Sequence, residues 1–558
     1  MKSFTLCLPF AFSALLLAGT LAVSAAGGEA ANVSRAIGDE RREAEREARI
    51  RNLREKRDAA APDSATSAEG APQDVDDGET FLIAAVEFST PSRVFSQDEL
   101  HAFREMLPRG NVSVGALRRW LDAINRNYAA RGLAVAQALA AIRGNALVVS
   151  LLEPEVDAVT VGGNATTREG FVKSQIGIEP GDLVNMDDFH ARLLRFNATN
   201  DVAARIAFAP GSRYGTSSVE EILVEPPRFS AAIFTDNYGN YATGELRGGA
   251  YGVWRSVTGR RDTLCAGGVL SEGSKSLFAS YDVPVPGLSG VHLLAGGDFS
   301  KTEIVNGELR DIDLTGKYYD AFLGVKVPLF VSETLISNLT LTATTKRGES
   351  LVSGERIQKS DTDTLCAEAD LLWFFDGGHV YSKIGATQGF NISGNSDKYT
   401  YFELYAEAEN ELPGSLYDRV RFDGGWSADQ DKIPSSESFQ LGGIYSVRGY
   451  ESSFLCGAKG FSASAELGCD LTKTPLSLRS LPTSRAFVFF DYGRVFDDAR
   501  QGGSGLRRPI YSTGFGLRVA ADRFWEADLT GAWLLADHPY ERAGEDAFKL
   551  LFSLKAKF

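Results

Sequence analysis

The sequence predicts a mainly β protein whose larger part is an antiparallel β-barrel that spans a membrane. Residues 227–558 contain segments of about ten residues in which apolar and polar side chains alternate, separated by Gly, Asn, Asp and Ser turns. Before this region, two consecutive stretches each show the order strand, helix, helix, strand, strand. A charged helix and an apolar leader precede them. At about 20 residues per strand and turn, the barrel region holds roughly 16 strands.

Residues 1–26 have the features of a secretory signal. Lys2 supplies the positive charge, Phe10–Val23 is the apolar core, and Ser24-Ala25-Ala26 offers small residues for cleavage. No run of about 20 apolar residues follows, so the sequence predicts no transmembrane helix. We therefore expect an exported chain.

Residues 27–58 form the predicted charged helix. The part from residue 34 to residue 57 is nearly all Arg, Glu and Ala, with Glu45/Arg49 and Glu47/Arg51 at i, i+4 spacing. A helix that is polar all round stands in solvent or in a wet channel. A solvated charged tail is the simpler alternative. Residues 59–78, rich in Ala, Pro, Ser, Asp and Gly, are predicted to be a disordered linker.

Residues 79–153 and 154–226 form two predicted α+β units of similar pattern. Each is near the smallest size that folds without help. Two such units in series resemble POTRA domains, which bind extended polypeptide beside a strand edge; two plain α+β spacers are the alternative. The predicted elements of the first unit are Phe81–Phe88, a helix opened by the capping box Ser96-Gln97-Asp98-Glu99, Val114–Arg131 ending at Gly132, Ala134–Leu139 and Ala146–Leu152. Those of the second are Val156–Val161, Arg168–Gln175, Met186–Phe196 capped by Asn185, Val202–Phe208 and Val219–Val224.

The stretch Phe439–Tyr450 combines glycines and one fixed charge, Arg448, with apolar and aromatic side chains. An arginine in such surroundings needs a carboxylate partner, because its guanidinium cannot lose its charge. Asp491 is the candidate, since it is the lone acid in an aromatic strand. Period-two alternation places Phe487, Phe489, Asp491 and Gly493 on one face of that strand, and Val488, Phe490 and Tyr492 on the other. An acid belongs in the lumen, so the second face is expected to meet lipid.

The chain resembles the two-partner secretion transporters, a branch of the POTRA-bearing outer-membrane superfamily. The resemblance spans nearly the whole chain and includes Val447-Arg448-Gly449-Tyr450 and Phe489-x-Asp491-x-Gly493 in that order. It implies a sixteen-stranded barrel in a bacterial outer membrane, with the POTRA-like domains in the periplasm. It further implies a loop folded into the lumen, in which Arg448 pairs with Asp491, Phe489 and Gly493 shape the seat, and Tyr450 packs beside it.

The same resemblance implies roles for both ends of the chain. Residues 27–58 would match the plug helix of the family, which lies in the pore and can leave it. Phe558 would match the terminal aromatic residue that barrel-assembly machinery reads. The implied partners are a secreted exoprotein, that machinery and outer-membrane lipid.

Composition and motifs exclude several other classes of function. The net charge of −15 argues against a nucleic-acid partner, which needs clustered Lys and Arg. No HExxH, CxxC, GxSxG or phosphate-binding loop occurs, so we predict no enzyme, no metal and no cofactor. The histidines are scattered: His101, His190, His292, His379 and His538. Cys456 and Cys469 lie close in sequence, and whether they form a disulfide or remain free thiols is open.

Three functions fit these features. The first is a transporter that passes an unfolded partner protein outward, after the POTRA-like domains recruit it by strand addition. The second is a barrel-assembly insertase of the same superfamily, although insertases usually carry more POTRA domains and no plug helix. The third is a porin-like structural channel, which has no use for an arginine that faces Asp491.

Overall fold

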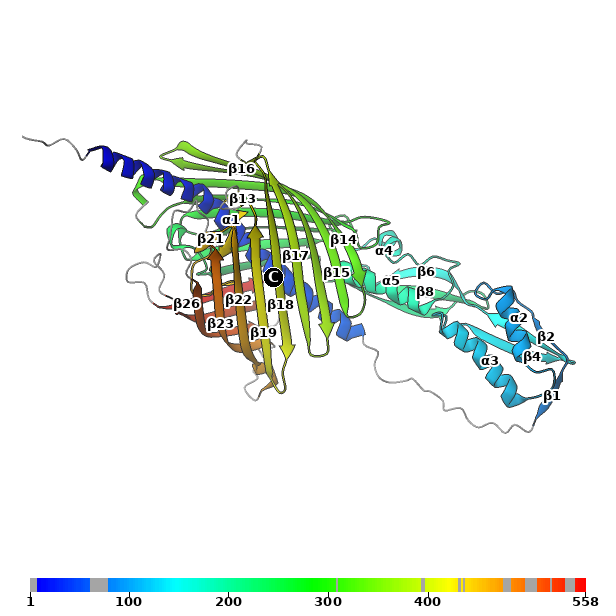
Figure 1. The fold of residues 1–558 in the computed structure, drawn as a ribbon. Coiled ribbons are helices and arrows are strands. Elements are labelled where there is room, and N and C mark those ends of the chain that lie inside the picture. Colours follow the sequence, from blue (N-terminus) through cyan, green and yellow to red (C-terminus); the bar gives the residue numbers. More distant parts are fainter. Residues whose placement is uncertain are drawn as a thin grey trace, which may run out of the picture. The chain divides into compact units, whose positions relative to one another are not determined.

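The computed structural model describes residues 8–60, 79–307, 310–392, 397–429, 433–434, 437–474, 483–496, 509–521, 524–536 and 547–558 (Figure 1). Helix α1 spans Leu8–Ala60, and its side chains are described from residue 30 to residue 57. The side chains of the predicted signal, residues 1–26, and of the predicted linker, residues 59–78, lie outside the described residues. Among the described helices, none combines the length and the apolar character needed to cross a bilayer.

The chain divides into two compact units. One contains Met1–Ile50, Pro227–Val285 and Val291–Phe558; the other contains Arg51–Pro226 and Pro286–Gly290. The first of these is the barrel with most of α1, and the second holds the two α+β repeats. We describe each unit by itself.

The first α+β repeat has two more strands than its sequence predicts. Its elements are β1 (Thr80–Ile83), β2 (Ala85–Phe88), α2 (Gln97–Met106), β3 (Gly110–Ser113), α3 (Val114–Ala129), β4 (Gln137–Arg143) and β5 (Ala146–Leu152). The single strand expected at 81–88 is wrong: it is broken at residue 84, because β1 pairs with β3 whereas β2 runs parallel to β5. The expected strand at 134–139 starts later, at Gln137, because Ala136 still closes a turn onto Leu133.

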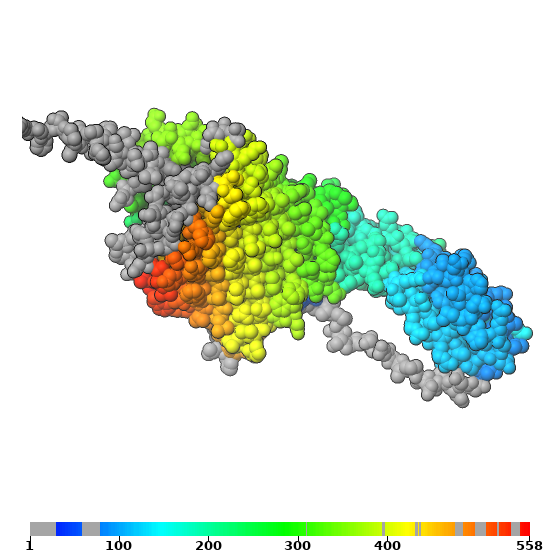
Figure 2. Space-filling model, viewed as in Figure 1, coloured from blue at the N-terminus to red at the C-terminus, as the bar shows by residue number. Residues whose placement is uncertain are grey.

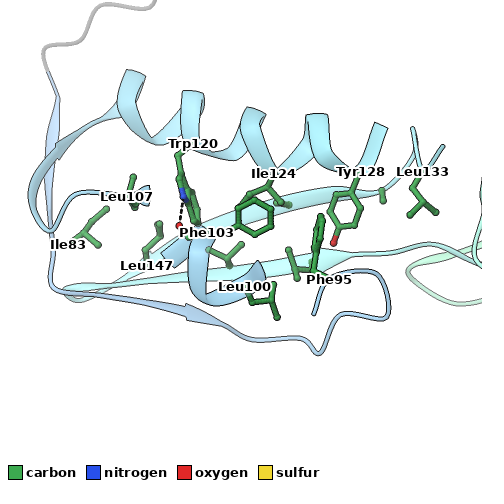
Figure 3. Packing of buried hydrophobic residues seen from close by; sticks show 14 of the residues in the cluster. Ile83, Phe95, Leu100, Phe103, Leu107, Trp120, Ile124, Tyr128, Leu133 and Leu147 are labelled. Carbon is green, nitrogen blue, oxygen red and sulfur yellow. Dashed lines mark hydrogen bonds between the residues drawn. The ribbon is translucent and has the colours of Figure 1, made fainter. Parts of the chain in front are cut away.

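One buried cluster joins the helices of this repeat to its sheet. Trp120, Ile124 and Tyr128 recur on one face of α3, where Trp120 lies beside Phe103 and Tyr128 lies beside Phe95, as Figure 3 shows. The Trp120 indole N–H donates to the Phe103 carbonyl at 2.8 Å, so burying the ring leaves no unpaired donor. The predicted capping box of α2 is confirmed, with Ser96 and Glu99 each accepting from the other's backbone N–H.

The second repeat has the predicted element order. It consists of β6 (Glu155–Gly162), α4 (Glu169–Ile176), α5 (Met186–Thr199), β7 (Ala203–Pro210) and β8 (Thr216–Val224), with β8 central in the sheet. Asn185 caps α5, as predicted. Glu221 on β8 is 0% exposed, and neither of its carboxylate oxygens has a hydrogen-bond partner. Its burial raises the pKa of this carboxyl to about 7, against a weaker opposing effect of Lys173.

The two repeats contact each other through a glycine turn. Gly132, at φ +80°, ends α3 and accepts from the backbone N–H of Met186 at 2.8 Å. A Cβ at this position would lie 2.3 Å from Asn185 Oδ1, so only glycine allows this approach. Leu183 also packs against the core of the first repeat.

Sixteen antiparallel strands close into a barrel. They are β9 (Phe229–Asp236), β10 (Arg247–Arg255), β11 (Thr263–Leu270), β12 (Ser274–Pro284), β13 (His292–Glu303), β14 (Leu314–Val331), β15 (Leu335–Val352), β16 (Glu355–Phe375), β17 (Gly378–Phe390), β18 (Tyr399–Glu411), β19 (Leu416–Ser427), β22 (Lys459–Asp470), β23 (Thr483–Phe496), β24 (Ile510–Ala521), β25 (Trp525–Leu534) and β26 (Phe548–Lys557). Short 3-10 turns follow β9 (η1, Tyr241–Thr243), β13 (η2, Arg310–Ile312) and β22 (η5, Leu471–Lys473). The expected strand number and closure are confirmed.

The two faces of the barrel wall differ in character. On β23, Val488 and Phe490 are 56% and 48% exposed on the outer surface, whereas Phe489 and Asp491 are 3% and 0% exposed. Figure 2 shows this outer surface over the strands coloured green to orange. The apolar face is thus outward and the polar face inward, as a lipid-facing barrel requires. Among the described residues, Cys456 and Cys469 do not form the disulfide that the sequence left open, and Cys265 and Cys366 form none either.

The ring closes between its first and last strands. β26 pairs with β9 from Ser553 opposite Asp236 to Lys557 opposite Ala232. Phe558 extends this seam, because its N–H donates to the Ala231 carbonyl at 2.8 Å and its carbonyl accepts from Ala231 at 3.0 Å. The Phe558 side chain is 74% exposed.

Candidate functional site in the barrel lumen

The segment between β19 and β22 folds back against the inner wall. Within it, β20 (Phe439–Leu441) and β21 (Leu455–Gly457) form a short antiparallel pair. Gly442 and Gly443, at φ +109° and +99°, provide the tight turn after β20. We call residues 439–457 the inward loop. Its apolar side chains share one buried cluster with wall residues: Tyr399, Tyr401, Ile433, Phe439, Leu441, Val447, Tyr450, Leu455, Ala458, Val495 and Ile510.

The inward loop brings Arg448 to Asp491 on β23. Arg448 Nε donates to Asp491 Oδ2 at 2.7 Å, and Nη2 donates to Oδ1 at 2.6 Å. The backbone N–H of Arg448 adds a third bond to Oδ2 at 3.0 Å. The side chains are only 5% and 0% exposed. The pair is therefore bidentate, directional and almost dry.

Sequence reasoning missed two further hydrogen-bond partners of this arginine. Arg448 Nη1 donates to Glu466 Oε1 at 2.5 Å, and Nη2 donates to Ser464 Oγ at 2.9 Å. Glu466 is shared with Arg518, whose Nη2 lies 3.0 Å from Oε1. Ser464 and Glu466 lie on β22 opposite Asp491 and Phe489. Their alternation with Ala463, Ala465 and Leu467 was the available signal, but using it required the strand register.

The other predicted site residues shape the seat of the loop. The Phe489 ring lies under the guanidinium, with its centroid 3.7 Å from Arg448 Cζ. Gly493 makes room for Leu441, because a Cβ there would lie 2.3 Å from Leu441 Cδ1. Gly449, at φ +93°, meets β25, where its Cβ would lie 2.8 Å from Leu534.

Val447 and Tyr450 anchor the loop rather than the ion pair. Val447 is 0% exposed within the apolar cluster. Tyr450 packs its ring against Phe454 at 5.2 Å, and its hydroxyl donates to the Ala536 carbonyl at 3.2 Å. The Tyr450 ring therefore packs within the apolar core of the loop, whereas the resemblance placed it beside the Arg448–Asp491 pair.

Helix α1 occupies the lumen from residue 30 to residue 50, where it is visible behind the strands in Figure 1. Its contacts with the wall include several ion pairs, beside the packing of Ala30 and Ala31 against Tyr318. Glu40 Oε2 lies 2.8 Å from Arg247 Nη2 on β10, and Arg41 Nη1 lies 3.2 Å from Asp298 Oδ1 on β13. Several charged residues of this helix are thus paired with the wall, whereas Arg42 and Asp39 pair within the helix.

The helix also touches the inward loop. Arg35 Nη1 donates to the Ser438 carbonyl at 2.7 Å, directly before the loop. Gln440 Nε2 donates to Asn32 Oδ1 at 2.8 Å. On β19, Arg421 donates to the Tyr445 carbonyl at 3.1 Å. Helix, loop and wall therefore form one connected polar network inside the barrel.

Among the described residues, no group of three or more His, Cys, Asp or Glu side chains is placed to bind a metal ion. The ion pairs join segments that are far apart in the sequence. The inward loop additionally shares an apolar cluster with the wall.

Comparison with known proteins shows which family and which relatives this chain resembles. The model of the family "Haemolysin secretion/activation protein ShlB/FhaC/HecB" matches residues 215–519. The heme/hemopexin transporter protein HuxB of Haemophilus influenzae (strain 86-028NP) is 21% identical over 451 residues, which cover 75% of this chain and 77% of HuxB.

Solved structures share the fold. CdiB from Escherichia coli superimposes with a TM-score of 0.70 at 19% identity, covering 95% of this chain and 98% of CdiB. BamA from Haemophilus ducreyi lacking POTRA domains 1-3 gives a TM-score of 0.52 at 13% identity, covering 86% of this chain and 99% of BamA.

Proposed function

Because the chain belongs to the haemolysin secretion/activation protein family, we propose that it carries an unfolded partner protein from the periplasm through its barrel to the cell surface or medium. It is a two-partner secretion transporter of the bacterial outer membrane. The observation that carries the proposal is a closed sixteen-stranded barrel whose lumen contains a helix and a loop of the same chain, both joined to the wall by ion pairs. Its partner is a secreted exoprotein, and no catalytic step is assigned to it.

The two α+β repeats are proposed to act as POTRA domains that recruit the partner in the periplasm. Each repeat has an open strand edge that supports this role. In the sheets β2-β5-β4 and β6-β8-β7, the strands β4 and β7 each have a described neighbour on one side only. An extended segment of the partner could add to such an edge through backbone hydrogen bonds. Residues 1–26 would direct the chain to this compartment.

The Arg448–Asp491 pair is proposed to be the latch of the inward loop. Three hydrogen bonds join the two residues at one point of the wall, in a nearly dry setting. A bidentate pair of this kind fixes both position and orientation. The apolar cluster around Val447 holds the rest of the loop in place, and the ion pair fixes the loop at Arg448.

Helix α1, within residues 27–58, is proposed to be a removable plug. Support comes from the ion pairs that join it to the wall, because water and counterions can replace an ion pair when the helix leaves. No ATP is present in the periplasm, so folding of the partner outside the cell is the proposed source of work.

Phe558 is proposed to be the terminal signal read by the barrel-assembly machinery. Its backbone closes the seam with Ala231, and its side chain stays 74% exposed, where another protein can reach it. The outer wall is proposed to contact outer-membrane lipid.

The test of the transport function compares two variants of the full chain. We expect Arg448→Ala to leave a folded barrel in the membrane and to reduce secretion of the partner at least tenfold. Arg347→Ala removes an arginine of the β15–β16 hairpin that pairs with Asp363, and we expect normal secretion. The partner is identified as the large protein that disappears from the medium when the transporter gene is deleted.

An insertase remains the second candidate, because BamA shares the fold. Depletion of this chain separates the two functions. If other outer-membrane barrels fail to assemble and no secreted protein is lost, the insertase assignment replaces the transporter assignment. A porin-like channel would instead leave both secretion and assembly intact.

A further inference from the structure

The two signs of charge on helix α1 lie on different faces. Glu40, Glu43 and Glu47 are spaced i, i+3, i+7, so they share one face. Arg35, Arg42, Arg46 and Arg49 are spaced i, i+7, i+11, i+14 and share a second face, turned by about 120° from the first at about 100° of rotation per residue. Asp39 and Glu45 lie beside this face and pair within the helix with Arg42 and Arg41. The helix therefore presents an acidic face and a basic face while carrying almost no net charge.

The basic face meets acids on one arc of the barrel. Arg41, which flanks this face, reaches Asp298 on β13 at 3.2 Å, and Arg49 lies 3.6 Å from Asp370 on β16. Arg46 lies 3.7 Å from Glu407 on β18. Farther along the helix, Arg35 lies 4.0 Å from Glu403, also on β18. We call these four wall residues, Asp298, Asp370, Glu403 and Glu407, the acidic sector.

The acidic face meets arginines on the remaining arc. Glu40 lies 2.8 Å from Arg247 on β10, and Glu47 lies 2.8 Å from Arg419 on β19. Glu43 Oε1 lies 3.6 Å from Arg419 and 3.8 Å from Arg421. The basic sector consists of Arg247, Arg419 and Arg421.

The order of the strands makes these sectors face each other. The acidic sector comes from the arc β13 to β18, and the basic sector comes from β19 and, past the seam, from β10. The boundary lies where Glu407 on β18 stands opposite Arg421 on the neighbouring strand β19. Each charged face of the helix therefore lies against the wall sector of opposite charge.

We propose that the emptied lumen is a binding site for extended polypeptide whose acidic and basic side chains alternate along the chain. The proposal rests on the proposed function, since it requires helix α1 to leave. Successive side chains of an extended chain point to opposite sides, so alternating charge gives such a segment one acidic and one basic side. This is the pattern that the helix achieves with a different period. The sectors that hold the plug then hold and orient the polypeptide that replaces it.

The test uses the chain without residues 30–57, reconstituted in planar bilayers, where peptide binding is read as block of ion current. Two unstructured peptides of identical composition are compared: one alternates Glu and Arg, and the other carries them in two blocks. We expect the alternating peptide to bind about tenfold more tightly. In the Arg419→Glu/Arg421→Glu variant, which reverses part of the basic sector, that preference is expected to vanish. In the Lys275→Glu/Lys301→Glu control, which reverses the same number of charges at exposed positions on β12 and β13, it is expected to persist.

The outcomes separate this proposal from the plug role of α1. A pore that stays closed without residues 30–57 overturns the plug role and this proposal together. An open pore that binds both peptides equally, or that keeps the preference after the Arg419→Glu/Arg421→Glu reversal, refutes the proposed role of the two sectors and leaves the plug role of α1 standing. A synthetic peptide of residues 30–57 should restore the block in the unreversed pore, and its Glu47→Arg form should bind the reversed pore more tightly than the unreversed one.

Discussion

Removing the guanidinium of Arg448 tests the central contact of the lumen. In Arg448→Ala, Asp491 loses both side-chain bonds and keeps, among its described partners, the backbone N–H of residue 448. Glu466 is better protected, because Arg518 still lies 3.0 Å away. One buried carboxylate is thus left almost without compensation. Breaking a buried pair in this way costs about 3–5 kcal/mol.

The cost should depend on which partner is removed. Asp491→Ala leaves Arg448 bonded to Glu466 at 2.5 Å and to Ser464 at 2.9 Å, so we expect a smaller loss, about 1–3 kcal/mol. In Arg448→Ala/Asp491→Ala no charge remains buried alone. We expect the double variant to be at least as stable as Arg448→Ala, with a coupling of about 2 kcal/mol between the two sites.

The assay follows the loss of the compact barrel on heating, which is seen as a change in gel mobility, together with chymotrypsin cleavage within the inward loop, after Tyr445, Tyr450 or Phe454. Arg448→Ala should melt first and be cleaved fastest. If the costs of the two single changes simply add in the double variant, Arg448 and Asp491 do not act as a pair, and the latch is refuted.

Three further outcomes are expected. First, burial raises the pKa of Glu221 to about 7, whereas the pKa of a glutamate in the unfolded chain is about 4.3. The contribution of this carboxyl to stability is therefore full below the unfolded pKa and is lost as the pH rises through the folded pKa. The second repeat should lose about 3 kcal/mol of stability between pH 4.5 and pH 8, as measured by hydrogen exchange of β8. Second, Gly493→Ala should displace Leu441 and expose the inward loop to trypsin, at a cost of about 1–3 kcal/mol. Third, Glu225→Gln should weaken the turn at Thr166 and Thr167, whose backbone and hydroxyl groups donate to this carboxylate, by about 1.5–3 kcal/mol, as measured by exchange of the turn amides.

Each of these has a matched control. Glu221→Gln should flatten the pH dependence, whereas Glu220→Gln, at the exposed neighbouring position, should preserve it. For Gly493 the control is Gly385→Ala, where the nearest atom would be 3.6 Å away. Glu220→Gln also serves as the control for Glu225→Gln, and equal protection of the turn in both would contradict the assigned role of Glu225.

The sequence was most informative where a period and a chemical requirement coincide. Alternation placed Asp491 with Phe489 on the inner face, because an unpaired acid is too costly in lipid. A fixed charge among apolar groups indicated that Arg448 needs a carboxylate. The caps at Ser96 and Asn185 were readable because each depends on local hydrogen bonds only.

The remaining features depend on contacts between distant parts of the chain. Glu466 reaches Arg448 only because β22 pairs with β23 in one register. The charged helix looked solvent-exposed because its partners are contributed by β10, β13, β16 and β19. The break at residue 84 could not be predicted from the local sequence either, because β1 and β2 pair with different strands.

The seam has a consequence for the assembly order of this protein. Closure joins β9 to β26, and Asn237 donates to the Leu550 carbonyl 313 residues later. So non-local a contact forms late, after the intervening hairpins have paired with their sequence neighbours. Until then both edge strands expose unsatisfied backbone groups, which is untenable in hydrocarbon. The open sheet must therefore be shielded from lipid by another protein until β26 pairs with β9, and this pairing is the last step before the barrel is stable in the bilayer.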